Sequence, residues 1–156
     1  MNIDELIPSL KNGQGLERAK AAEALGKAKD RRAVKPLIEA LHDRNSAVRN
    51  NAAFALGMIG ASEAVPDIKL LLKDSEEWVR KSAAKTLGLL RAHGAVEELV
   101  AAMGDPSYMV RKNVARSLGQ IGGETAEKAL EKAVSDTDRI VAHTAKEALV
   151  KLQAGS

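Results

Sequence analysis

Two kinds of charged residue return at a fixed interval and could form a reactive array. Arginine recurs every 31 residues, and aspartate recurs at the same interval between the arginines. The positions are Arg18, Arg49, Arg80 and Arg111, with Asp43, Asp74, Asp105 and Asp136. A feature repeated in every unit is structural by default, because an active site is needed only once. We therefore predict a ladder in which each arginine makes charge-assisted hydrogen bonds to an aspartate of its own or of the neighbouring repeat.

Cysteine and histidine, which carry much nucleophilic and metal chemistry, are scarce. The sequence has no cysteine, which excludes disulfides, thiolate metal sites and cysteine nucleophiles. Its three histidines, His42, His93 and His143, share no position in the 31-residue interval, and none is followed by glutamate. The glycines recur with the same interval instead of forming a phosphate-binding loop. The sequence predicts a protein that is not an enzyme and has no metal or cofactor.

The same interval governs the apolar residues, which identifies the elements that position these side chains. Equivalent leucines lie at Leu25, Leu56, Leu87, Leu118 and Leu149, and similar apolar columns start at Leu6, Leu10, Ala21 and Val48. Within one repeat the spacing is helical, as in Val48, Ala52, Leu56 and Ile59. Each repeat is therefore a pair of short antiparallel helices. The pairs must stack, because one pair alone cannot bury its apolar face.

The predicted fold is all-α, a solenoid of five 31-residue helix pairs in a single domain over residues 1–156. The repeats are expected at about 2–29, 30–60, 61–91, 92–122 and 123–153. The ten helices are expected at 2–11 and 16–28, 32–42 and 45–59, 63–73 and 76–90, 94–104 and 107–121, and 124–135 and 138–152. Pro8 lies inside the first of them and should kink or shorten it.

The most regular part of the repeat is a motif on its second helix. It comprises Val48-Arg49, Ala52-Ala53 and Leu56-Gly57, and it returns at Val79-Arg80 and Val110-Arg111. The motif resembles the HEAT-like repeats named after phycocyanobilin lyase subunits, over essentially the whole chain. The resemblance implies an alpha-alpha superhelix of the HEAT/armadillo type whose concave side is lined by the helices with the Val-Arg pair. The family includes chromophore lyases, binding scaffolds and hydroxylases that hold iron through His-Glu pairs, which this chain lacks.

The second helix of each repeat also carries a stripe opposite its buried residues, which we call the inner stripe. It comprises residues 46, 47, 50, 51, 54 and 58 and their equivalents at steps of 31. All three aromatic residues of the chain, Phe54, Trp78 and Tyr108, fall on it. Because Trp and Tyr are frequent hot spots of interfaces, we predict a partner-binding face here. The predicted face is Phe54, Met58, Trp78, Lys81, Lys85, Leu89, Tyr108, Met109, Lys112, Asn113 and Arg116.

Positive charge is concentrated on the inner stripe. Eight basic and three acidic residues give it a net charge of +5, whereas the whole chain carries +3. This favours a non-enzymatic scaffold that binds an acidic protein segment or helix. Nucleic acid, with bases against Trp78 and Tyr108 and phosphates on the lysines, is the second hypothesis. A bilin lyase-like accessory protein is the third, from the resemblance. No apolar run reaches the roughly 18 residues of a membrane span, so we expect no membrane partner. A chain without cysteine has the reducing cytoplasm as its default location, and we expect a cytoplasmic monomer.

Overall fold

Ten α-helices and four short 3-10 segments form the part of the chain that the computed structural model describes, residues 1–155. The helices are α1 (Ile3–Asn12), α2 (Gly15–Ala28), α3 (Val34–Ala40), α4 (Ser46–Ile59), α5 (Val65–Ile68), α6 (Glu77–Leu89), α7 (Val96–Ala102), α8 (Tyr108–Ile121), α9 (Glu124–Ala133) and α10 (Arg139–Ala154). The all-α prediction and the ten helices are confirmed, and no strand is present among these residues. Ser156, the last residue of the predicted domain, lies outside the described residues.

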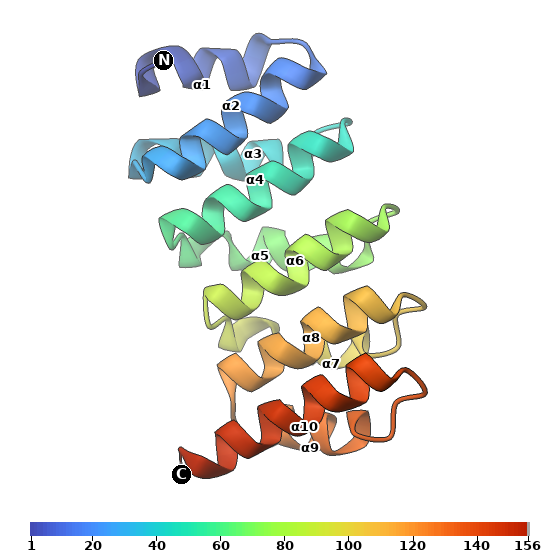
Figure 1. Ribbon diagram of the computed structural model, residues 1–156. Coiled ribbons are helices and arrows are strands. Elements are labelled where there is room, and N and C mark those ends of the chain that lie inside the picture. The colour runs from blue at the N-terminus through green and yellow to red at the C-terminus, as the bar shows by residue number, and fades with distance from the viewer. Residues whose placement is uncertain (156) are drawn as a thin grey trace.

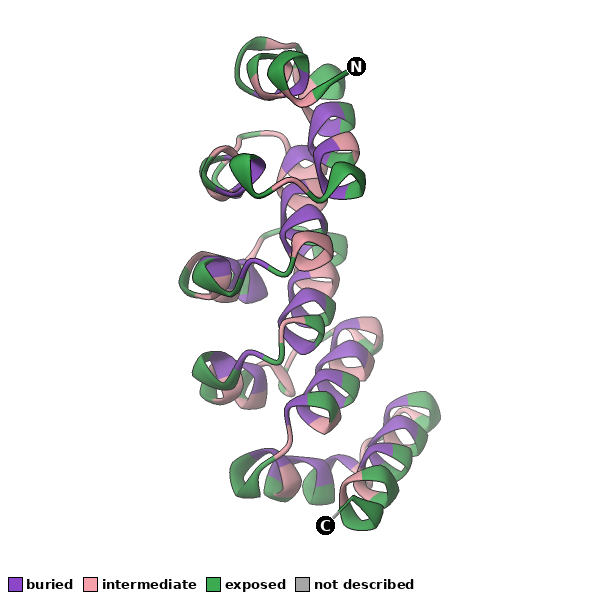
Figure 2. Ribbon diagram, turned by 90° about the vertical axis from the view of Figure 1, so that its left-hand side faces the viewer, coloured by how far each residue is buried: buried purple, intermediate pink, exposed green. Residues whose placement is uncertain are grey.

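The helices form two parallel rows (Figure 1). The even-numbered helices lie side by side in one row, and the odd-numbered helices form the row behind them. Figure 2 shows both rows bending toward the even-numbered side, so that α2 to α10 line the concave side of a shallow arc. The even-numbered helices also pack against one another far more extensively than the odd-numbered ones do. The long helices with the Val-Arg pairs therefore carry the inner face.

The odd-numbered helices in the middle of the stack are shorter than predicted. The expected helix at 63–73 is divided into 3-10 segment Ser62–Ala64, α5 and 3-10 segment Lys69–Lys73. The expected helices at 32–42 and 94–104 likewise begin as the 3-10 segments Arg31–Ala33 and His93–Ala95. Terminal turns of helices tighten readily to the 3-10 form, and in short helices these turns make up most of the length.

Pro8 does not shorten the first helix, so that part of the expectation was wrong. α1 continues four residues beyond it, to Asn12. The proline removes the N–H that would bond to the carbonyl of Asp4. Both residues are exposed, so water can satisfy this carbonyl and the helix tolerates the loss.

The predicted apolar columns form one continuous core. Leu25, Leu56, Leu87 and Leu118 are fully buried, and the column from Leu6 is buried in all five repeats. Small residues bring the even-numbered helices close together. A Cβ added at Gly26 would lie 2.7 Å from the Cα of Ala55, and one at Gly119 would lie 2.7 Å from the Cβ of Ala148. The glycine column therefore sets the close packing of neighbouring layers.

Candidate partner-binding face

The arginines and aspartates pair between repeats. Arg49 Nε donates to Asp74 Oδ2 at 2.8 Å and its Nη2 donates to Asp74 Oδ1 at 3.0 Å. Its Nη1 donates to the backbone carbonyl of Asp43, in its own repeat, at 2.8 Å. The same pattern joins Arg18 to Asp43, Arg80 to Asp105 and Arg111 to Asp136. Each arginine thus ties the turn of its own repeat to the aspartate of the next.

The surroundings of three of these carboxylates, those of Asp43, Asp74 and Asp136, favour the ionised form. Partial burial by itself would raise the pKa of Asp74. The hydrogen bonds from the Arg49 side chain and from the backbone N–H of Glu76 outweigh burial, so the pKa lies below its ordinary value. The same balance lowers the pKa of Asp43 and of Asp136. A carboxylate held in this way is a poor general base, and the arrangement supports a structural ladder rather than a catalytic array.

The histidines do not converge on one another. His42 Nε2 lies 3.2 Å from Asp67 Oδ1, and His143 Nε2 lies 2.8 Å from Glu147 Oε1 on the same helix. His93 is exposed at the start of the 3-10 segment before α7. Within residues 1–155, no three acidic or histidine side chains gather in a way that could hold a metal ion.

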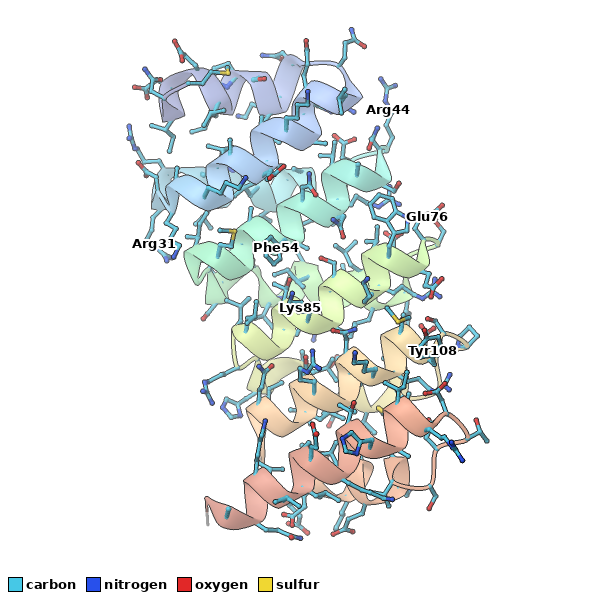
Figure 3. All side chains as sticks on the ribbon, viewed as in Figure 1. Arg31, Arg44, Phe54, Glu76, Lys85 and Tyr108 are labelled. Carbon is cyan, nitrogen blue, oxygen red and sulfur yellow. The ribbon has the colours of Figure 1, made fainter. Side chains whose placement is uncertain are left out.

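The three aromatic side chains are exposed, as predicted. Phe54, Trp78 and Tyr108 retain 39%, 40% and 42% of their accessible surface. They come from α4, α6 and α8, three adjacent helices of the inner row. Lys85 Nζ lies 5.5 Å from the centre of the Phe54 ring, a cation–π contact between α6 and α4. Figure 3 shows Phe54 and Lys85 near the middle of the face and Tyr108 toward its edge, where α8 begins.

Most of the other predicted residues reach the surface to different extents. Lys85, Leu89 and Arg116 are exposed, whereas Met58, Lys81, Met109 and Lys112 are half-buried. Asn113 is a correction, because it is only 9% exposed and its Nδ2 donates to the carbonyl of Met109 at 2.8 Å. Asn113 lies at the edge of the inner stripe. Because α8 has α6 on one side and α10 on the other, residues at this edge are the first to be covered by a neighbouring helix. Asn113 therefore does not belong to the exposed face.

A row of apolar residues runs along the stack and was not identified from the sequence alone. Stepping by 31 through Trp78 gives Leu16, Ala47, Trp78, Met109 and Ile140, one residue near the start of each even-numbered helix. Leu16 is 68% exposed and Ile140 is 48% exposed. The signal was present in the sequence, since every residue at this position is apolar although none belongs to the core columns. The row extends the surface around Trp78 in both directions along the stack.

The acidic side chains of the inner stripe are already engaged. Glu23 pairs with Lys27 at 2.6 Å, Glu147 with His143, and Glu77 accepts a hydrogen bond from the hydroxyl of Ser107. By contrast, Lys81, Lys112 and Arg116 have no ion-pair partner among the described residues. The uncompensated charge at the centre of this face is therefore positive.

Comparison with known proteins identifies relatives of the same architecture. The family profile described as HEAT repeats matches residues 3–69 and 65–150. Among curated proteins, the comparison gave no match. No helix within residues 1–155 is long and apolar enough to cross a membrane.

Three solved structures illustrate the likeness. A chain of the CpcE–CpcF complex of phycocyanin lyase from Nostoc sp. PCC7120 is 27% identical with a TM-score of 0.88, over 99% of this chain and 66% of that chain. An engineered protein is 26% identical with a TM-score of 0.70, over 97% and 79% of the two chains. A computationally designed armadillo repeat protein for modular peptide recognition, 23% identical with a TM-score of 0.70 over 94% and 80%, shares the fold. This chain thus spans just under two thirds of the lyase chain.

Proposed function

Since this chain belongs to the HEAT repeat family, we propose that it is a non-enzymatic scaffold that binds an acidic segment of a protein partner on the even-numbered face. One observation carries the proposal. Exposed aromatic side chains lie on three adjacent helices, α4, α6 and α8, on the concave side of the stack, and the unpaired cations Lys81, Lys112 and Arg116 lie on α6 and α8 beside them.

The apolar side chains provide anchors of the kind that dominate binding energy at interfaces. Trp78 and Tyr108 are large, keep about two fifths of their surface free, and lie near the starts of neighbouring helices. Met109 adjoins them in the row that contains Trp78. Phe54 and Met58 of α4, with Leu89 of α6, form a second apolar area nearer the C-terminal ends of their helices.

The charges define the partner's chemistry. Lys81 and Lys112 occupy the same position in successive repeats, between the Trp78 row and the Phe54 area. Neither is compensated by an acidic neighbour, so a segment with Asp or Glu between its apolar residues would complement both features. A concave wall strengthens the field of these cations compared with a flat surface.

A second candidate is an accessory role in bilin attachment. It is favoured by the 27% identity and the TM-score of 0.88 to a chain of the phycocyanin lyase complex. Mixing the protein with a free bilin and recording the absorption spectrum tests it, and a shift of the bilin band would support it.

The proposed function is tested with a double variant, Trp78→Ala with Tyr108→Ala. Proteins captured from the native lysate by wild type are identified, and the acidic segment of the captured partner is synthesised for affinity measurements. Truncation of a central aromatic anchor costs at least about 2 kcal/mol, which is a roughly 30-fold loss of affinity. We therefore expect the double variant to lose more than about 30-fold, and about 1,000-fold if the two losses add.

The matched control is Leu70→Ala. Leu70 is 60% exposed in the 3-10 segment after α5, which belongs to the odd-numbered row. We expect this variant to bind as wild type does. Equal affinity of wild type and the double variant would contradict the proposal.

A further inference from the structure

A pocket that shares Arg116 with the partner-binding face opens between α8 and α10. Its volume is about 320 Å³. The lining residues come from the end of the α6 layer, from α8 and from α10: Arg91, Arg116, Gly119, Gln120, Thr144, Glu147, Ala148 and Lys151. Most of the residues that line this pocket are polar or charged, unlike those around Trp78 and Tyr108. The pocket lies toward the C-terminal ends of the even-numbered helices.

Three cationic side chains from three successive repeats meet at this pocket. Arg91 follows α6 with a positive φ of 48°, and its Nη1 donates to the carbonyl of Gln120 at 3.1 Å. This bond holds the guanidinium beside α8 and leaves its other N–H groups free of protein acceptors within residues 1–155. Arg116 and Lys151 make no ion pair or side-chain hydrogen bond with any described residue.

The one acidic residue in the lining does not neutralise them. Glu147 is four residues before Lys151 on α10, a spacing at which the two could pair. Its Oε1 instead lies 2.8 Å from Nε2 of His143, one turn in the opposite direction. The carboxylate is drawn toward the start of α10, and the cations at the other end are left uncompensated.

We infer that this pocket binds a phosphate group carried by a phosphorylated side chain of the protein partner. A phosphate monoester brings a charge of about −1.5 to −2 and three strong acceptor oxygens, which two arginines and a lysine can share. The planar guanidinium matches two phosphate oxygens at once, whereas a single carboxylate would leave part of the donor set unused. That the phosphate arrives on the partner segment rests on the proposed function, whereas the anion site itself does not.

The site is tested without the partner. Inorganic phosphate is titrated into the ¹⁵N-labelled protein, followed by a ten-residue Gly-Ser peptide with one central phosphoserine and by the same peptide unphosphorylated. We expect saturable shifts at the amides of Gly119 and Gln120 and at Arg116 Nε with phosphate and with the phosphopeptide. The unphosphorylated peptide should bind at least about tenfold more weakly than the phosphopeptide.

Charge variants distinguish a specific phosphate site from a general effect of the protein's net positive charge. Arg116→Gln and Lys151→Gln should each weaken phosphate binding about fivefold or more, and Glu147→Gln should strengthen it. Lys146→Gln is the matched control, because it removes the same charge from an exposed position of α10 outside the pocket, and it should change affinity less than about twofold.

Three results would overturn the inference. One is a titration that does not saturate, and another is an equal loss in Lys146→Gln and Arg116→Gln. The third is tighter, Arg116-dependent binding of a single-stranded oligonucleotide than of the phosphopeptide, which would assign the pocket to nucleic acid. Absence of phosphate binding would not change the expected affinity loss of the Trp78 and Tyr108 double variant. The two proposals can therefore be contradicted independently of each other.

Discussion

Leu87 and Trp78 lie on the same helix, α6, in opposite surroundings. Leu87 is fully buried in the central layer, whereas Trp78 keeps 40% of its surface. Truncating Leu87 to alanine should lower the free energy of unfolding by about 2–5 kcal/mol, because it leaves a cavity between repeats. Trp78→Ala should cost much less. Chemical denaturation of both variants decides this, and equal losses would show that the two faces are wrongly assigned.

The ladder carboxylates make the stability of the protein depend on pH. Because the folded state lowers the pKa of Asp74, the ladder stabilises the protein above the unfolded value of about 3.9 and loses this contribution as pH falls through the folded value. Asp74→Asn should therefore cost about 2 kcal/mol at pH 7, where it leaves Arg49 without its carboxylate. The difference from wild type should shrink at pH 3. Urea denaturation at both values checks this, and a constant difference would argue against an ionic ladder.

Two of the even-numbered helices, α2 and α4, end in the left-handed conformation that suits glycine. The residues after α2 and α4 are Lys29 and Gly60, with φ of 53° and 78°. A side chain in the left-handed region costs roughly 1–2 kcal/mol, partly offset by the greater freedom of glycine in the unfolded chain. Lys29→Gly should therefore stabilise the protein by about 0.5–1 kcal/mol, and Gly60→Ala should destabilise it by about 1 kcal/mol. Thermal or urea denaturation measures both.

Gly94 supplies the control for this pair. A Cβ at Gly60 or at Gly94 would have no atom within 4 Å, but only Gly60 has a positive φ. Gly94→Ala should leave stability unchanged or raise it slightly. If Gly60→Ala and Gly94→Ala behaved alike, the helix-end conformation would not be the cause.

At the scale of the whole molecule, the field of the concave face should govern how quickly the partner associates. Reversing Lys81 and Lys112 to glutamate should weaken binding mainly through the association rate, and the effect should diminish at high salt. The charge-matched control is Lys35→Glu with Lys132→Glu, two exposed positions on the odd-numbered helices α3 and α9. Stopped-flow or surface-binding kinetics at two salt concentrations provide the measurement.

The same experiment separates the classes of partner. For a protein segment, the aromatic double variant should be the more damaging, and wild-type affinity should fall only mildly between low and moderate salt. For nucleic acid, affinity should fall by orders of magnitude over that range, with charge reversal the worse change. An unchanged association rate in the Lys81 and Lys112 variant would show that this face does not steer the partner.

The interval of 31 residues determined the architecture without any structural information. An apolar column repeated without insertion or deletion admits one explanation, a stack of equivalent helix pairs, and the buried leucines from Leu25 to Leu118 follow it. The exposure of Phe54, Trp78 and Tyr108 was predictable for the same reason, since the helical period places them opposite the core. Periodicity fixes which side of a helix a residue occupies.

The folded structure shows how neighbouring layers meet. It showed that Arg49 reaches Asp74 of the next repeat, that Asn113 is covered at the margin of its helix, and that Glu147 turns to His143. The first two depend on the offset and closeness of two helices, which a period along one chain does not contain. The third is a choice between two partners one turn away on the same helix, His143 and Lys151, which spacing alone leaves open. The side-chain contacts in the folded structure settle whether a surface cation is paired, and so the free charge of Arg116 and Lys151 does not follow from spacing along the chain.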